Sequence, residues 1–103
     1  MHHQDHTEHI RMLRECAEAC RRCAEADREG MCADLCTSCA ELCETTASIL
    51  ERGALPHEAQ RALLDACAAV CRACAAECRQ HGNEHCQACA DACERCAEAC
   101  ASH

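Results

Sequence analysis

Between Cys86 and Cys100 the chain places a cysteine at every third or fourth position. Positions three and four residues apart lie on one face of an α-helix, because the helix has about 3.6 residues per turn. Charged residues such as Glu94, Arg95 and Glu98 fall on the other faces. The pattern predicts an amphipathic helix whose buried face consists of thiols. The cysteines on this face are Cys86, Cys89, Cys93, Cys96 and Cys100.

Three earlier segments repeat this pattern, and the four segments together contain all 16 cysteines of the chain. The earlier cysteines are Cys16, Cys20 and Cys23, then Cys32, Cys36, Cys39 and Cys43, then Cys67, Cys71, Cys74 and Cys78. Residues that start or end helices separate the segments, namely Thr7 or Asp5, Gly30, Gly53, Pro56, Gly82 and Asn83. We therefore expect helices over 7–28, 32–50, 56–80 and from Asn83 nearly to His103.

The two halves of the chain repeat each other. A shift of 51 residues places Cys16, Cys20 and Cys23 on Cys67, Cys71 and Cys74, and a shift of 50 places Cys36, Cys39 and Cys43 on Cys86, Cys89 and Cys93. A duplicated helical hairpin explains this repeat. The expected fold is all-α, an antiparallel four-helix bundle with cysteines lining its core, and residues 1–103 form a single domain.

Antiparallel packing predicts two different ends for this bundle. At one end we expect an apolar plug, made of Met12, Leu13, Ile49, Leu50, Leu63 and Leu64. At the other end we expect a polar mouth, with Asp27, Met31, Cys32, Cys78, His81, His85 and Cys86. The exposed chain ends should carry His9 and His103.

A line of alanines at positions 62, 66, 69, 73 and 76 should help the third helix approach its neighbours within the chain, with an oligomer contact as the alternative.

Composition restricts what can fill this core. The chain has no aromatic residue, and only 13 of its 103 residues are leucine, isoleucine, valine or methionine, so thiols must occupy much of the interior.

The net charge of −8 and the absence of lysine exclude a nucleic-acid partner. No apolar run approaches the roughly 20 residues that span a membrane, and the chain begins without a secretion signal. We therefore expect a cytoplasmic protein, in which cysteines bind metal more often than they form disulfides.

Buried thiolates select soft metal ions, chiefly Cu(I), Zn(II) and iron–sulfur clusters. One Cu(I) per thiolate would leave the core neutral, whereas four Zn(II) among sixteen thiolates would leave eight negative charges there. This comparison favours Cu(I). A thiolate Zn(II) buffer, an iron–sulfur protein and a disulfide-stapled helical protein remain alternatives. No single cysteine stands out as a nucleophile, so we expect no enzyme.

The repeated Cys-x-x-x-Cys-x-x-Cys pattern on four predicted helices resembles the cytosolic bacterial copper storage proteins, over nearly the whole chain. The resemblance implies a four-helix bundle that holds many Cu(I) ions along its core and assembles as a homotetramer. It implies that all sixteen cysteines are storage ligands and that His81 and His85 lie at the mouth. Asp27 stands where the second half has Cys78, so this position lacks a thiol. A copper chaperone or a small thiol would deliver the metal.

Overall fold

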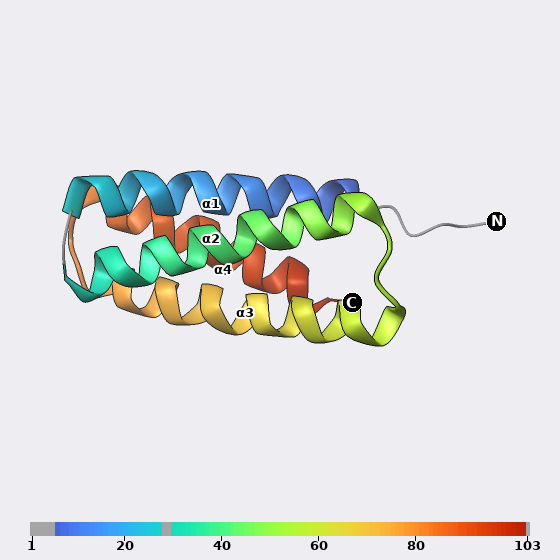
Figure 1. Cartoon of the computed structure of the whole chain (residues 1–103). Helices are drawn as coiled ribbons and strands as arrows, with labels where there is room; N and C mark the ends of the chain where they lie inside the picture. Colours follow the sequence, from blue (N-terminus) through green and yellow to red (C-terminus); the bar gives the residue numbers. More distant parts are fainter. Residues whose placement is uncertain (1–5, 28–29, 103) are drawn as a thin grey trace.

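The computed structural model describes residues 6–27 and 30–102, and within them the chain forms four α-helices and no strand. Helix α1 spans Thr7–Asp27, α2 spans Met31–Arg52, α3 spans His57–Arg79 and α4 spans Glu84–Ala101. Figure 1 shows the four helices running side by side along one axis. The predicted all-α bundle is confirmed.

The helix ends agree with the expected positions to within a few residues. Gly30 precedes α2 with a φ of 103°, and Gly53 follows it with a φ of 64°, both in the left-handed region that glycine adopts easily. The Gly53 N–H donates to the carbonyls of Ile49 and Leu50, which satisfies groups that the end of a helix leaves unpaired. Asn83 precedes α4 as expected, but its side chain makes no capping hydrogen bond. Asp5, Arg28 and His103 lie outside the described residues.

The helices form a square bundle of 46 × 18 × 18 Å. Each helix packs against two neighbours, in the pairs α1–α2, α2–α3, α3–α4 and α1–α4. The diagonal pairs α1–α3 and α2–α4 meet through cysteine side chains on the bundle axis, as Cys16 and Cys71 do at 4.0 Å. The α1–α2 and α3–α4 links lie at one end of the bundle, and the α2–α3 link lies at the other (Figure 1). Every helix therefore turns one face toward a common axis. In the described part of the chain, no helix combines the length and apolar character that a membrane crossing requires.

Charged pairs on the surface join the two helices of each hairpin. Arg21 of α1 donates to Glu44 of α2, with an Nε to Oε2 distance of 2.9 Å. Arg79 of α3 donates to Asp91 and to Glu94 of α4, at 2.7 and 2.8 Å. These side chains are about half exposed, and such pairs each contribute a few tenths of a kcal/mol to about 1 kcal/mol. Their arrangement follows the predicted division into two hairpins.

The line of alanines on α3 lies on the surface, so the expectation of packing within the chain is wrong. Ala62, Ala66, Ala69, Ala73 and Ala76 are all exposed. At about 100° per residue, this line is rotated by roughly 150° from the cysteine face of the same helix. Other alanines, such as Ala68 and Ala75, sit beside the cysteines and are buried. The outer face of α3 is therefore formed by small apolar side chains, and we call it the alanine face.

Three leucines close one end of the bundle. Leu13, Leu50 and Leu64 are at most 3% exposed and belong to the continuous core. The other members of the predicted plug, Met12, Ile49 and Leu63, are half-buried. The plug thus exists but is narrower than the sequence suggests.

His9 lies at the plug end and is half-buried, which corrects the expectation that it is a solvent-exposed residue. Its Nε2–H donates to the carbonyl oxygen of Ala99 at 2.9 Å. This carbonyl belongs to the last turn of α4 and also accepts a hydrogen bond from the Ser102 N–H at 3.3 Å. His9 therefore helps to close the bundle where α4 contributes no large aliphatic side chain.

Candidate metal centre

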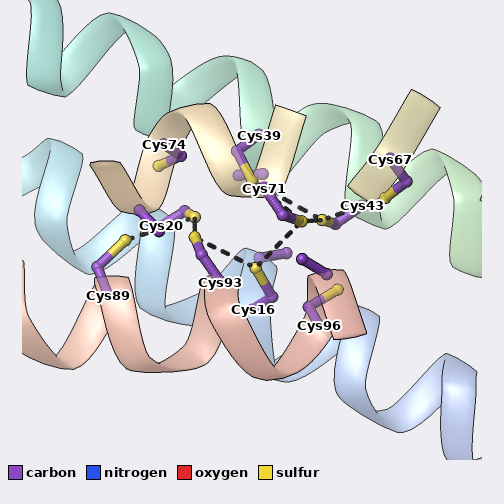
Figure 2. Packing of buried hydrophobic residues seen from close by; sticks show 14 of the residues in the cluster. Cys16, Cys20, Cys39, Cys43, Cys67, Cys71, Cys74, Cys89, Cys93 and Cys96 are labelled. Atoms are coloured by element: carbon purple, nitrogen blue, oxygen red, sulfur yellow. Dashed lines mark hydrogen bonds between the residues drawn. The ribbon is translucent and has the colours of Figure 1, made fainter. Parts of the chain in front are cut away.

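All sixteen cysteines face the bundle axis, as the spacing predicts. Each is free, buried and at most 5% exposed. Figure 2 shows cysteines from the four helices projecting into the same interior space, with their sulfur atoms close together. The core of this protein is a column of thiols surrounded by alanines.

Neighbouring sulfur atoms along most of the column are separated by only 3.6 to 4.0 Å. From Cys32 near the mouth, short Sγ to Sγ distances continue without a break to Cys67 near the plug. The cysteines joined in this way are Cys32, Cys78, Cys36, Cys74, Cys89, Cys20, Cys93, Cys16, Cys71, Cys39, Cys43 and Cys67. A metal ion can therefore move along the column by exchanging one thiolate ligand at a time.

The sulfur atoms also form compact groups of four, in which all Sγ atoms lie within 4.8 Å of one another. These groups are Cys16/Cys39/Cys43/Cys71, Cys16/Cys20/Cys39/Cys93, Cys20/Cys74/Cys89/Cys93 and Cys23/Cys36/Cys78/Cys89. A metal bound at about 2.3 Å from each sulfur holds its ligands roughly 3.7 to 4.0 Å apart. The column is thus already close to the spacing of a metal–thiolate cluster. Several groups share a cysteine, which is the arrangement needed for bridging thiolates.

Burial favours the protonated form of three thiols near the mouth. Loss of solvent, together with the neighbouring Asp27 carboxylate, raises the pKa of Cys32 to about 11. Burial also raises the pKa of Cys23 and of Cys78. Binding of a metal ion must therefore displace protons from these thiols, and metal affinity falls as the pH is lowered.

These raised pKa values predict how the stability of the metal-free protein depends on pH. In the unfolded chain a cysteine has a pKa of about 8.5, so the unfolded state loses its protons first as the pH rises. The free energy of unfolding should be unaffected below about pH 8.5 and should fall between there and pH 11, by on the order of 2–3 kcal/mol for Cys32 alone. Urea unfolding of reduced protein at a series of pH values measures this fall. A constant midpoint between pH 8 and 11 would contradict it.

The two histidines predicted at the mouth have different surroundings. His85 Nε2 donates to Asp27 Oδ1 at 3.0 Å, and this hydrogen bond lowers the pKa of Asp27. His81 Nε2 lies 3.0 Å from Glu77 Oε2, on the same helix end, and belongs to no group of cysteines. Only His85 is therefore brought into contact with the thiol column. Met31, also expected at the mouth, is 67% exposed.

Thr46 is one residue of the column that the cysteine spacing did not predict. Its side chain is fully buried and its hydroxyl has no hydrogen-bond partner among the described residues. Thr46 follows Cys43 by three residues, and the 50-residue shift places it on Cys96. The same shift places Leu50 on Cys100. The repeat therefore contained the signal, and it marks where the thiol face of α2 ends.

The geometry of the thiol column fits any soft metal ion. The family is shown by comparison with known proteins. The family model described as Csp, copper storage protein, matches residues 2–103. The chain belongs to the copper storage protein family. No curated protein matches it.

Solved structures of this family share the fold over almost the full chain. The apo form of copper storage protein 3 from Bacillus subtilis is 33% identical, with a TM-score of 0.87 over 95% of this chain and 97% of that one. A Cu(I)-bound copper storage protein, BsCsp3, is 32% identical, with a TM-score of 0.85 over 96% and 97% of the two chains. A cytosolic copper storage protein from Streptomyces lividans, described with five coppers, is 38% identical, with a TM-score of 0.83 over 89% and 85%.

Proposed function

We propose that this chain stores Cu(I) in the cytoplasm, with residues 1–103 acting as one storage domain and all sixteen cysteines as ligands. Membership of the copper storage protein family supports this function, and one structural observation carries the assignment of ligands. That observation is the continuous series of sulfur atoms, 3.6 to 4.0 Å apart, from the mouth almost to the plug. A column of this kind suits a cargo of many ions held in clusters.

The burial of the column supports storage rather than catalysis by a cysteine. Catalysis by cysteine needs one accessible thiolate beside a base, in a site open to substrate. Here every cysteine is at most 5% exposed, and its nearest neighbours are mostly other thiols. The chain therefore acts as a container whose cargo is the metal itself.

Capacity is the direct test of this function. Reduced protein should bind about 12–16 Cu(I) per chain, because near-unit stoichiometry neutralises the buried thiolates. Anaerobic titration against a chromogenic Cu(I) chelator, followed by metal analysis of the isolated protein, measures the capacity. Saturation at four ions or fewer would overturn the storage function.

A matched pair of variants separates the column from the rest of the fold. Replacing Cys39 and Cys43 by alanine removes two neighbouring thiols from the centre of the column and should lower the capacity by about two ions. Replacing the exposed residues Ala66 and Ala73 by serine changes the same number of positions and should leave the capacity unchanged. Equal capacities in the two variants would show that the ions bind elsewhere.

The mouth is the route that we propose for copper. The opposite end is closed by Leu13, Leu50 and Leu64, which would have to admit an ion through an apolar layer. At the mouth, His81 and His85 are partly exposed and offer nitrogen ligands that hold Cu(I) less tightly than thiolate does. Such residues are suited to receiving copper from a chaperone or a small thiol and passing it to Cys86 and Cys23.

We further propose that several copies of the chain assemble through the alanine face, forming a homotetramer as the family resemblance implies. The face covers five exposed alanines along four turns of α3, and it carries no charge of its own. Small side chains allow two helices to approach closely and to bury backbone and methyl groups together. A second copy of the same face is the partner whose shape fits it, as in a two-fold contact that joins two chains. A homotetramer then needs a second contact between two such pairs.

A further inference from the structure

The mouth of the column contains a carboxylate and an imidazole beside its thiols. Asp27 is the last residue of α1 and His85 lies in the first turn of α4, and the two side chains meet at 3.0 Å. Cys23 and Cys86 lie beside them, with their Sγ atoms 3.8 Å apart. Cys86 Sγ is 3.9 Å from Asp27 Oδ2. Two thiols, one imidazole and one carboxylate therefore converge at one point.

This combination of ligand atoms differs from the rest of the column. Each of the other compact groups consists of four thiols, which suit Cu(I). A carboxylate oxygen is a hard ligand and is a poor ligand for Cu(I). Zinc, by contrast, binds cysteine sulfur, histidine nitrogen and aspartate oxygen in one tetrahedral site. The chemistry of the mouth thus favours a divalent ion over the cargo.

We propose that Cys23, Asp27, His85 and Cys86 form a binding site for one tetrahedral divalent metal ion, and that zinc is the ion this set of ligands selects. All four ligand atoms lie within 4.8 Å of one another. Zinc bonds of about 2.0 to 2.3 Å place tetrahedral ligands roughly 3.3 to 3.8 Å apart, close to the three distances at the mouth. Closure around an ion therefore requires only small side-chain movements.

Charge and position support the same assignment. Two thiolates and a carboxylate carry three negative charges, so a divalent ion leaves one, whereas Cu(I) would leave two. The Asp27 and His85 side chains are 19% and 32% exposed, so water can stabilise the remaining charge. The N-terminus of α4, which carries partial positive charge, lies beside Cys86 and favours anionic ligands there.

A divalent ion at this site would close the column. Cys23 belongs both to this site and to the thiol group Cys23/Cys36/Cys78/Cys89 behind it. While the divalent ion holds Cys23 and Cys86, an incoming Cu(I) cannot bind the two thiolates that it would otherwise meet first. The site would therefore slow copper entry and release without occupying storage positions deeper in the core.

Cobalt(II) alone is the probe that tests the site, because tetrahedral cobalt bound to thiolate gives visible absorption. Titration of reduced, copper-free protein should show one tight equivalent of cobalt with tetrahedral and thiolate bands. Asp27→Asn and His85→Ala should each weaken this binding at least tenfold and alter the bands, since each removes a direct ligand. Zinc should displace the cobalt at one equivalent.

His81 and Glu77 provide a matched control, because they form a second histidine–carboxylate pair at 3.0 Å without nearby cysteine ligands. His81→Ala and Glu77→Gln should leave the cobalt affinity and bands unchanged. Cobalt binding that Asp27→Asn and His85→Ala leave unchanged would overturn the site, as would several equivalents of equal affinity. The Cu(I) capacity of the Glu77→Gln variant should equal that of the native chain, so a failure of storage would be seen separately from a failure of the cobalt site.

The closure of the column is tested by rates. One equivalent of zinc, added before copper, should slow Cu(I) uptake by the native chain and by His81→Ala severalfold. It should have no effect on Asp27→Asn or His85→Ala, which retain the thiols but lack the site. Equal slowing in all variants would show that zinc acts on the thiol column itself, and would contradict the proposal.

Discussion

Copper loading is expected to raise the unfolding temperature of this protein by more than 20 °C. The ligands of each ion come from several helices and are brought together only in the folded bundle, so the free energy of binding adds to the free energy of unfolding. An ion present at 100 times its dissociation constant adds about 2.7 kcal/mol. In a domain of this size, 1 kcal/mol raises the midpoint by about 4–8 °C. A few bound ions are therefore enough for the expected rise.

Circular dichroism of apo, partly loaded and fully loaded protein under anaerobic conditions measures this effect. The midpoint should rise with each addition of Cu(I) and return to the apo value when a chelator removes the metal. The Cys39→Ala and Cys43→Ala double variant should show a smaller rise, because it binds fewer ions. Superimposable melting curves for apo and loaded protein would mean that the bound copper does not join the helices.

Placing charge on the alanine face is expected to break the proposed assembly into smaller units. In an assembled protein, glutamates at Ala69 and Ala73 would lie inside a contact between two helices, where an unpaired charge is strongly unfavourable. Light scattering of the double variant should then give a smaller multiple of the chain mass, 11.2 kDa, than the native protein gives. The helix content should not change, because both positions are exposed in the single bundle.

Exposed positions on α2 provide the control for this prediction. Ser38→Glu and Thr45→Glu add the same charge to another outer face and should leave the native mass unchanged. An alanine-face variant that keeps the native mass would assign the contact to another surface. A native protein that is already a single chain would remove the proposal altogether.

The sequence was most informative where a local pattern determines the structure. A repeat of three and four residues places Cys86 through Cys100 on one helix face whatever the rest of the chain does, and all five are buried. Glycines at Gly30 and Gly53 end helices because of their own backbone freedom, and they stand where the sequence places the helix boundaries. The fold follows from these local features and from the repeat of the hairpin.

What could not be predicted depends on how residues from different helices meet. Asp27 and His85 are 58 positions apart, and their contact depends on the relative heights of α1 and α4 in the bundle. The contact of His9 with the carbonyl of Ala99 is a second case, since these residues are 90 positions apart and belong to α1 and α4. The surface position of the alanine face, by contrast, could have been predicted. Rotation by about 100° per residue already places these alanines away from the cysteine face of the same helix.

The end of the thiol face at Thr46 has a consequence for how such proteins change over time. Thr46 and Leu50 occupy the positions where the second hairpin has Cys96 and Cys100, and all four side chains fit the same narrow interior. Cysteine, threonine and alanine differ little in volume, so most exchanges among them leave the helices in place. The number of thiols can therefore rise or fall one codon at a time while the architecture stays constant. Evolution can adjust how much metal a cell holds in each molecule without inventing a new protein.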